Sequence, residues 1–233
     1  VTLTLPDGEA LVLCRVLGRH KLLVAASDLG HAPHLMLDGY WKWWVTAFLS
    51  RNLLPGQRFA DAGAGYGYFS LLAGELVGPE GRVLAVEAHP VLAGLLRRNI
   101  GLNGMADRAQ SRFGALGSTT TAVLRLAVPP ETPTAARLLE EEAEADTPVA
   151  LVPAAPPLDV LLPDGADWVK LDLNGAEPGA WDGMQGLVER CPKLGLIVAF
   201  DPQRLSGAAD WLGRLAARFP LRHIDADGIA RPI

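Results

Sequence analysis

Three glycines with one residue between each pair stand between two apolar stretches, in Gly63-Ala64-Gly65-Tyr66-Gly67. The stretch before them ends in Asp61, and apolar residues with helical spacing follow over 69–76. This order predicts a strand, a tight turn and a helix. Glycine tolerates positive φ and carries no Cβ, so a ligand can lie against the backbone at the helix N-terminus. We therefore expect a cofactor site formed by Asp61, Gly63, Ala64, Gly65, Tyr66 and Gly67.

The spacing of the glycines favours one class of nucleoside cofactor over another. Dinucleotide sites use G-x-G-x-x-G, whereas this turn reads G-x-G-x-G. Asp61 would repel a pyrophosphate but can help to hold a cation, such as the ammonium group of S-adenosylmethionine (SAM). A second apolar stretch over 82–86 ends in Glu87 and Ala88, and the Glu87 carboxylate can accept both hydroxyls of a ribose. The pattern favours SAM, with S-adenosylhomocysteine (SAH) as product. The alternatives are an NAD-dependent oxidoreductase and a tight turn with incidental acids.

Three blocks of the sequence together resemble a known family. They are the glycine turn, the stretch 83–104, and Trp168-Val169-Lys170-Leu171-Asp172-Leu173-Asn174-Gly175-Ala176-Glu177. Over about residues 55–200 the chain is similar to the FkbM-like SAM-dependent methyltransferases. It departs from the family pattern at Asn174, where the family usually has Glu, and at Asp201, in a segment where the family often has Glu-x-His.

The resemblance implies a class I methyltransferase that acts on a small molecule. In that family the loop after the third strand lies against the adenine. The third strand is expected over 111–116, so Gly114 and Ala115 are the candidates for this contact.

Asp172 and Glu177 are the best candidate catalytic carboxylates. Asp172 ends a predicted strand over 169–172, and ligands of open parallel sheets bind beyond the carboxyl ends of the strands. Methyl transfer needs an aligned nucleophile and, for a hydroxyl or ammonium group, a proton acceptor. Asp172 can serve as that base or orient the acceptor, and it is also a candidate for cofactor contact. Glu177 can share the chemistry or only interact with the dipole of the helix that it opens.

A divalent metal is a further option that we do not expect. Asp172, Asn174 and Asp201 offer oxygen ligands of the kind that magnesium prefers. The sequence does not place the three within reach of one ion.

Composition limits the class of protein and of partner. The chain has 233 residues, of which 49% are hydrophobic, which fits one domain over 1–233 with a sizeable core. A net charge of −5 without a basic cluster argues against nucleic acid and favours a neutral or cationic small molecule. No stretch approaches the ~20 apolar residues of a membrane span. Cys14 and Cys191 form no C-x-x-C pair, so we expect a reduced, cytoplasmic protein.

Residues 1–54 are expected to form an N-terminal addition to the SAM-binding core over 55–233. Strands over 11–16 and 21–25 flank a turn and predict a β-hairpin. A loop over 28–39 follows, with two histidines that can bind metal, assist proton transfer or serve as polar loop residues; we favour the last. These histidines are His31 and His34.

The next segment, 40–53, is predicted to be a helix because its apolar residues recur at helical spacing and a Pro-Gly pair ends it. Its aromatic residues can pack against the core or form a wall of the substrate pocket. The candidates for substrate contact are Tyr40, Trp41, Trp44, Asn174 and Asp201.

Residues 128–157 differ in composition from the rest, with seven prolines around an acidic run over 138–144 that we expect to be helical. We interpret this stretch as an insertion or flap. Its acidic run is either a solvated face or a surface that attracts a cationic substrate such as an amino sugar.

The remaining elements complete the predicted fold. A buried strand over 194–200, an amphipathic helix over 208–218 and a final hairpin over 221–230 follow the central blocks. Strands that alternate with helices predict an α/β, doubly wound, mostly parallel sheet, and the resemblance implies seven strands in a Rossmann-like arrangement.

These observations predict a SAM-dependent methyltransferase that acts on a hydroxyl or amine of a small molecule, sugar-bearing or another secondary metabolite. The alternative is a non-catalytic SAM-binding or partner-binding module with a degenerate active site.

Overall fold

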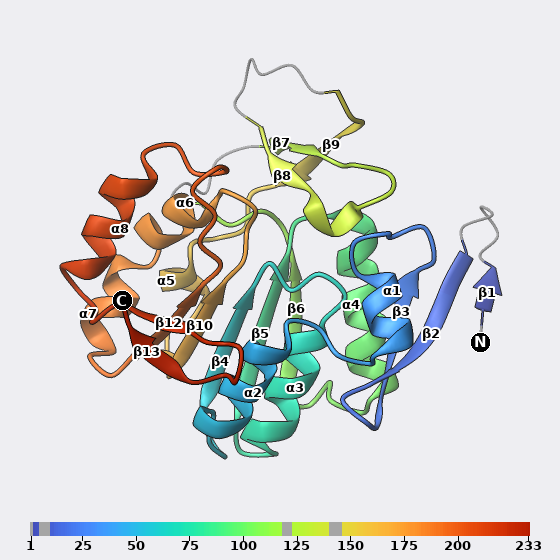
Figure 1. The fold of residues 1–233 in the computed structure, drawn as a ribbon, viewed down its shortest axis with the longest axis horizontal. Coiled ribbons are helices and arrows are strands. Elements are labelled where there is room, and N and C mark those ends of the chain that lie inside the picture. The colour runs from blue at the N-terminus through green and yellow to red at the C-terminus, as the bar shows by residue number, and fades with distance from the viewer. Residues whose placement is uncertain (1, 5–9, 118–122, 140–145) are drawn as a thin grey trace.

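A parallel sheet of five strands forms the centre of the computed structural model, which describes residues 2–4, 10–117, 123–139 and 146–233. The strands lie in the order β11-β10-β4-β5-β6 (Figure 1). Their bounds are β4 Arg58–Ala62, β5 Arg82–Glu87, β6 Ala109–Phe113, β10 Trp168–Leu171 and β11 Gly195–Val198. The alternation of strands and helices therefore gives the predicted α/β, doubly wound arrangement.

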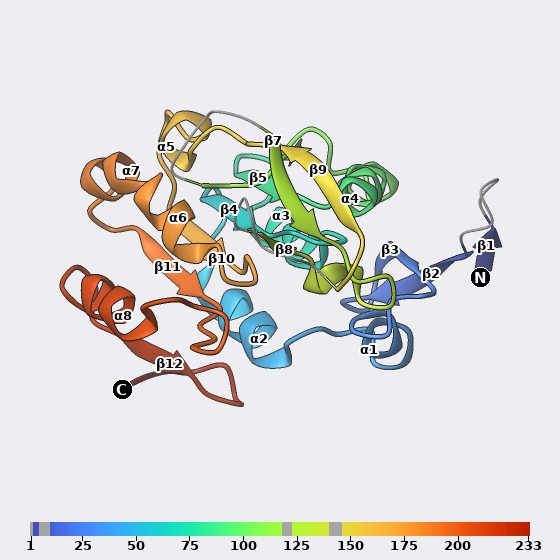
Figure 2. The ribbon, with the colours of Figure 1, turned by 90° about the horizontal axis from the view of Figure 1, so that it is seen from above.

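Helices cover both faces of this sheet, so its strands are apolar on both sides. Alternate residues of β4 belong to different cores: Phe59 packs in one, and Ala60 and Ala62 pack in the other. The first core includes residues of α2, α3, α4 and the N-terminal strands, and the second includes residues of α5 to α8. Viewed from above in Figure 2, α5, α6 and α7 lie on one side of the sheet and α2 on the other.

The helices predicted over 40–53, after the glycine turn, from Glu177 and over 208–218 are present with small shifts at their ends. They are α2 Trp43–Asn52, α3 Tyr68–Val77, α6 Glu177–Asp182 and α8 Ala208–Ala216. The structure also contains α4 Pro90–Leu102, α5 Leu158–Leu161 and α7 Gln185–Arg190. The segment expected as a loop over 28–39 contains a short helix as well, α1 Ala32–Leu37, with Pro33 in its first turn, where proline needs no N–H partner. None of the described helices is long and apolar enough to cross a bilayer.

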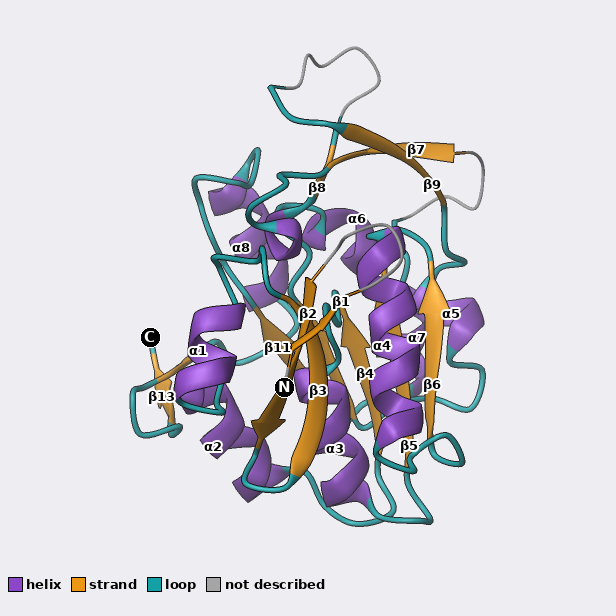
Figure 3. Cartoon of the chain, turned by 90° about the vertical axis from the view of Figure 1, so that its right-hand side faces the viewer, coloured by secondary structure: helices purple, strands orange, loops and turns teal. Residues whose placement is uncertain are grey.

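The predicted N-terminal hairpin is confirmed and packs against α4 (Figure 3). β2 Ala10–Val16 and β3 His20–Ala25 pair antiparallel, and β1 Thr2–Thr4 extends the sheet. Asn99 of α4 is buried and joins three segments, because its amide exchanges hydrogen bonds with both backbone groups of Leu23 and donates to the carbonyl of Tyr66 at 2.9 Å. The hairpin and the glycine turn are thus held to one helix.

The insertion is a small antiparallel sheet that stands above the carboxyl ends of the central strands (Figures 1 and 3). It contains β7 Val123–Ala127, a 3-10 turn η1 Pro133–Ala135, β8 Arg137–Leu138 and β9 Val149–Pro153, in the order β8-β7-β9. Its ends meet where Ala115 pairs with Ala154, so it begins earlier in the sequence than the predicted 128–157. The acidic helical run was expected from Leu138, which lies in β8; residues 140–144 are outside the described residues.

The C-terminal hairpin forms as predicted but does not join the central sheet. β12 Arg222–Ile224 and β13 Ala230–Pro232 make a separate two-stranded sheet, so the expected seven strands are not confirmed. The hairpin turn lies against α2 instead. Arg51 donates to the carbonyl of Gly228 at 3.2 Å, and a Cβ at Gly228 would lie 2.6 Å from the side chain of Ala47.

Candidate active site

A cavity of about 270 Å³ opens at the carboxyl ends of β4, β5, β6 and β10, beneath the insertion. Three groups of residues line it: the glycine turn and strand ends, the N-terminal segment, and the insertion with the loop after β10. Residues predicted from the sequence that line it are Trp41, Gly63, Ala64, Gly65, Tyr66, Glu87, Ala88, Gly114, Ala115, Asp172 and Asn174. Residues that line it without having been assigned a site role include Lys42, Thr134, Lys170 and Arg204.

The glycine turn brings bare backbone to the edge of the cavity. The N–H groups of Gly63 and Ala64 donate to the carbonyl of Val86 and so tie the turn to β5. Gly63 has a φ of +78°, and a Cβ there would lie 1.9 Å from the carbonyl oxygen of Asp172. Only glycine fits this position. Gly67 differs from the other two: it precedes α3, packs against Leu96 and does not line the cavity.

Glu87 connects the turn to the end of β5. Its carboxylate accepts from the N–H of Gly65 at 2.7 Å through one oxygen and from the N–H of His89 at 2.8 Å through the other. Burial raises the pKa of Glu87, although these two N–H groups oppose the shift. Each carboxylate oxygen has a second lone pair, so Glu87 can still accept hydroxyls from a ligand in the cavity.

Asp61 lies beneath the cavity, not at its surface as the sequence predicted. Its carboxylate is fully buried, with one oxygen 3.0 Å from Lys170 Nζ and the other accepting from the hydroxyl of Ser70. Lys170 faces Asp61 directly in the register of β10 and β4. Burial alone would lower the pKa of Lys170, but Asp61 and Asp172 outweigh it, and the net pKa is raised. A ligand ammonium therefore meets the paired lysine rather than a free carboxylate.

Asp172 is held between two lysines. One of its oxygens is 2.6 Å from Lys42 Nζ and 3.7 Å from Lys170 Nζ. Burial alone would raise the pKa of Asp172, but Lys170 and Lys42 outweigh it and hold the pKa below its usual range. Lys42 reaches Asp172 from a backbone with φ of +41°, a left-handed conformation that is uncommon for a residue other than glycine and clusters at functional sites.

Glu177 does not line the cavity, in contrast to its predicted catalytic role. It is buried, and its two oxygens accept from the N–H groups of Leu173 and Gly175 at 2.6 and 2.9 Å. The carboxylate therefore holds the loop after β10 in shape. This loop contains Asn174 in a left-handed conformation, with φ of +53°.

Asn174 attaches the insertion to the loop after β10. Its amide nitrogen donates to the carbonyls of Thr134 and Ala136 at 3.0 and 2.9 Å, and its oxygen accepts from Arg204 Nη1 at 2.7 Å. An ionised Glu, which the family pattern has here, could not donate to either carbonyl. An Asn in place of the family's Glu is thus what allows this residue to bind the carbonyls of the insertion above it.

The set of residues considered for a metal is not assembled as a site. Asp201 is exposed, pairs with Arg204 at 3.2 Å and does not line the cavity. Asn174 uses its oxygen on Arg204, and Asp172 is paired with lysines. Within the described ranges, no group of three His, Cys, Asp or Glu side chains is placed to hold a metal ion.

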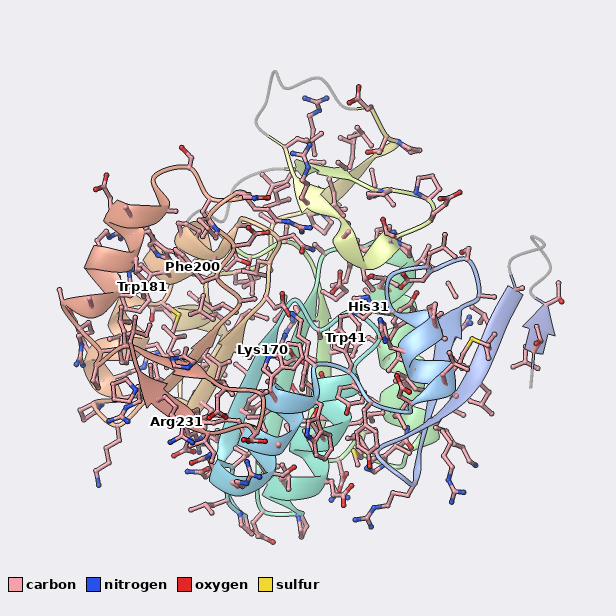
Figure 4. The ribbon with its side chains drawn as sticks, viewed as in Figure 1. His31, Trp41, Lys170, Trp181, Phe200 and Arg231 are labelled. Atoms are coloured by element: carbon pink, nitrogen blue, oxygen red, sulfur yellow. The ribbon has the colours of Figure 1, made fainter. Side chains whose placement is uncertain are left out.

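Of the three aromatic residues predicted to contact substrate, Trp41 alone lines the cavity. Tyr40 packs edge-on against Trp43, and both Tyr40 and Trp44 are exposed at the surface. Trp41 stacks on His31 with ring centroids 3.8 Å apart, and Figure 4 shows the two side by side, with Lys170 projecting from the central sheet nearby.

His31 lines the cavity, whereas His34 lies on the exposed face of α1 near Asp38. Burial lowers the pKa of His31 to about 4; Lys42 and Lys170 add to the shift, and Asp28 and Asp172 oppose it. The imidazole is therefore neutral at physiological pH. Sequence reasoning favoured a polar loop residue here, because nothing in the pattern showed which of two histidines three apart would turn inward.

Comparison with known proteins gives short matches to methyltransferases. No protein-family model matches the chain. A stretch of 50 residues is 52% identical to the protein-L-isoaspartate O-methyltransferase of Aeropyrum pernix and covers 22% of this chain and 19% of that protein. A stretch of 65 residues is 34% identical to the arsenite methyltransferase of Halobacterium salinarum and covers 28% of this chain and 16% of that protein. The chain spans about a fifth of the length of these relatives.

One solved structure aligns with most of this chain. The SAM-dependent O-methyltransferase of Thermotoga maritima aligns over 81% of this chain and 58% of that chain, with a TM-score of 0.42 and 15% sequence identity. The curated relatives support an assignment to the class I SAM-dependent methyltransferase superfamily. Membership of the FkbM-like family is not confirmed.

Proposed function

We propose that this protein is a SAM-dependent methyltransferase. The observation that carries the proposal is the junction of Gly65 and Glu87, where a positive-φ glycine turn and an acid at the end of the next strand are hydrogen-bonded to each other at the wall of one cavity. The turn offers backbone without side chains, and Glu87 keeps free lone pairs for the hydroxyls of a ribose.

The residues around the cavity fit the cofactor. Glu87 would hold the ribose, Gly114 and Ala115 would lie against the adenine, and the turn from Gly63 to Gly65 would lie along the amino acid part. When bound, SAM supplies an electrophilic methyl group on a sulfonium. The protein's own contribution is to exclude water, align the acceptor and take up its proton.

We propose a small molecule with a hydroxyl or amine as the acceptor, and a sugar-bearing or other secondary metabolite as its class. The polar lining of the cavity on the side of Trp41 and Asn174 supports hydroxyl-rich acceptors, which stack on aromatic rings and bond to amides and charged groups. The curated relatives are named for other acceptors, a protein isoaspartate and arsenite. The FkbM-like resemblance remains the basis of the sugar assignment.

The class of partner and the location that we propose follow from the net charge and the cysteines. A net charge of −5 supports a small-molecule partner in place of nucleic acid. Cys14 and Cys191 are both free thiols, which supports a reducing, cytoplasmic location.

Calorimetric titration with SAH, SAM and NADH tests the proposal. We expect SAH and SAM to bind to the wild-type protein, and Glu87→Gln to weaken SAH binding by about tenfold or more, since one ribose acceptor becomes a donor. Glu80→Gln, at an exposed site outside the cavity, is the matched control and should bind as the wild type does. Binding of NADH without SAH would establish the oxidoreductase alternative.

A methyl-transfer screen over sugars, amino sugars and amines then separates the enzyme from the module. Transfer to any of them supports the enzyme. Tight SAH binding with no acceptor methylated would favour a SAM-binding module instead.

A further inference from the structure

Of the two ring nitrogens of His31, one has a hydrogen-bond partner among the described residues and the other has none. Nδ1 lies 2.6 Å from the hydroxyl of Thr134, and among the described residues Nε2 has no hydrogen-bond partner. The ring is fixed in place by stacking on Trp41 and lines the cavity. Nε2 is thus the one basic atom of this side chain that can serve a ligand.

The partners of Thr134 determine where the imidazole proton lies. Asp28 is fully buried, and its oxygens lie 3.2 and 3.4 Å from the Thr134 hydroxyl. One of them also accepts the backbone N–H groups of Gly30 and His31. A carboxylate only accepts, so the single hydroxyl proton of Thr134 goes to Asp28. The hydroxyl oxygen must then accept from His31, which places the ring proton on Nδ1 and a lone pair on Nε2.

We propose that His31 is the proton acceptor of the reaction and that Thr134 and Asp28 are positioning residues that fix its tautomer. This inference rests on the proposed function. The acceptor's hydroxyl or amine gives its proton to His31 Nε2. Its lone pair forms the new bond to the methyl carbon as the carbon–sulfur bond breaks, with the electron pair of that bond left on sulfur. While the imidazolium exists, the negative charge of Asp28 stabilises it across Thr134. The imidazolium then releases the proton to water.

Asp172 is less suited to this role. The oxygen that contacts Lys42 and Lys170 is already paired, and the two lysines stabilise its ionised form. Taking up a proton would disrupt both contacts. Protonation of His31 at Nε2 keeps its Nδ1 bond to Thr134, although burial and the two lysines oppose the positive charge. Burial keeps His31 neutral before the reaction, and Lys42 and Lys170 add to this effect because they disfavour a further positive charge nearby.

The tautomer can be measured on the free protein, without cofactor or acceptor. Long-range proton–nitrogen NMR of protein labelled with [¹⁵N]histidine distinguishes the two tautomers, and the His31 signal is the one of five that disappears in His31→Gln. We expect the Nδ1-protonated form at pH 7. Thr134→Val should shift the balance toward the other tautomer, whereas Thr134→Ser, which keeps the hydroxyl, should restore it. An Nε2-protonated His31 in the wild type, or a Thr134→Val spectrum like that of the wild type, would overturn the proposal.

Kinetics with SAH as the binding probe separate this inference from the proposed function. In His31→Gln we expect SAH affinity within about twofold of wild type and single-turnover methyl transfer slower by ~100-fold or more, the usual range for loss of a general base. His223→Gln, on the exposed strand β12, should change neither. A wild type that does not bind SAH would refute the methyltransferase assignment. SAH binding with unchanged transfer in His31→Gln would refute only the role of His31.

Discussion

Loss of the amine of Lys170 should destabilise the protein far more than loss of a surface lysine. In Lys170→Met, the buried carboxylate of Asp61 keeps the hydroxyl of Ser70 as its one side-chain partner among the described residues. Removing one member of a buried ion pair costs about 3–5 kcal/mol, because the other charge is left uncompensated. In a domain of this size each kcal/mol shifts Tm by about 2–4 °C, so we expect a loss of roughly 6–20 °C.

Three companion variants make this prediction specific. Lys193→Met removes an exposed lysine and should leave Tm within ~1 °C. Asp61→Asn should cost less than Lys170→Met, since Lys170 retains Asp172 at 3.7 Å. The double variant should be more stable than Lys170→Met alone, because the carboxylate that lost its cation is then absent.

Differential scanning fluorimetry between pH 5 and pH 8 provides the assay. An unpaired, buried Asp61 takes up a proton more readily than it does in the unfolded chain. The stability deficit of Lys170→Met should therefore shrink as the pH falls. A stability deficit equal to that of Lys193→Met, or one that does not change with pH, would show that the ion pair of Asp61 and Lys170 does not stabilise the fold to this extent.

Further predictions concern the turn, the insertion and the histidine. Gly63→Ala should weaken SAH binding by more than tenfold, because its Cβ would collide with the carbonyl of Asp172; Gly56→Ala, with a similar φ of +82° but no atom within 4 Å, is the control that calorimetry should find unchanged. Asn174→Asp should increase hydrogen exchange over 133–136, since a carboxylate cannot donate to the two carbonyls there, and unchanged protection would contradict this role. The pKa of His31 is lowered to about 4, so the folded state binds fewer protons than the unfolded state, and the wild type should lose stability between pH 6.5 and pH 4 by more than His31→Gln does in denaturant titrations.

Local pattern was sufficient to predict the alternation of strands and helices and the strand ends that line one wall of the cavity. The glycine turn, Glu87 and Gly114 each follow a strand, and the carboxyl ends of neighbouring parallel strands lie together by topology. Lys42 was missed because its partner Asp172 is 130 residues away in the sequence, and only the path of the chain between α1 and α2 brings the two together.

Other sites show how a correct residue type can be given a wrong place. Glu177 is an acidic residue at the start of a helix, as expected. Its carboxylate accepts from two N–H groups of the loop after β10, which would otherwise lack an acceptor. Asp61 was assigned to the ligand because Lys170, on a strand far along the chain, was not recognised as its partner. The contact of Asp61 joins distant segments that no local spacing encodes, whereas those of Glu177 span only four and two residues.

The two halves of the cavity come from different parts of the chain. The glycine turn, Glu87 and Gly114 line one half from the stretch 63–115, whereas Thr134 and Asn174 line the other half from beyond it. The insertion leaves and rejoins the body where Ala115 pairs with Ala154, so its ends are neighbours in space. Segments with adjacent ends are the ones that evolution and engineering exchange most readily. A transplanted segment that preserved this junction and the anchor to Asn174 would replace one wall of the cavity while the glycine turn and Glu87 stayed in place.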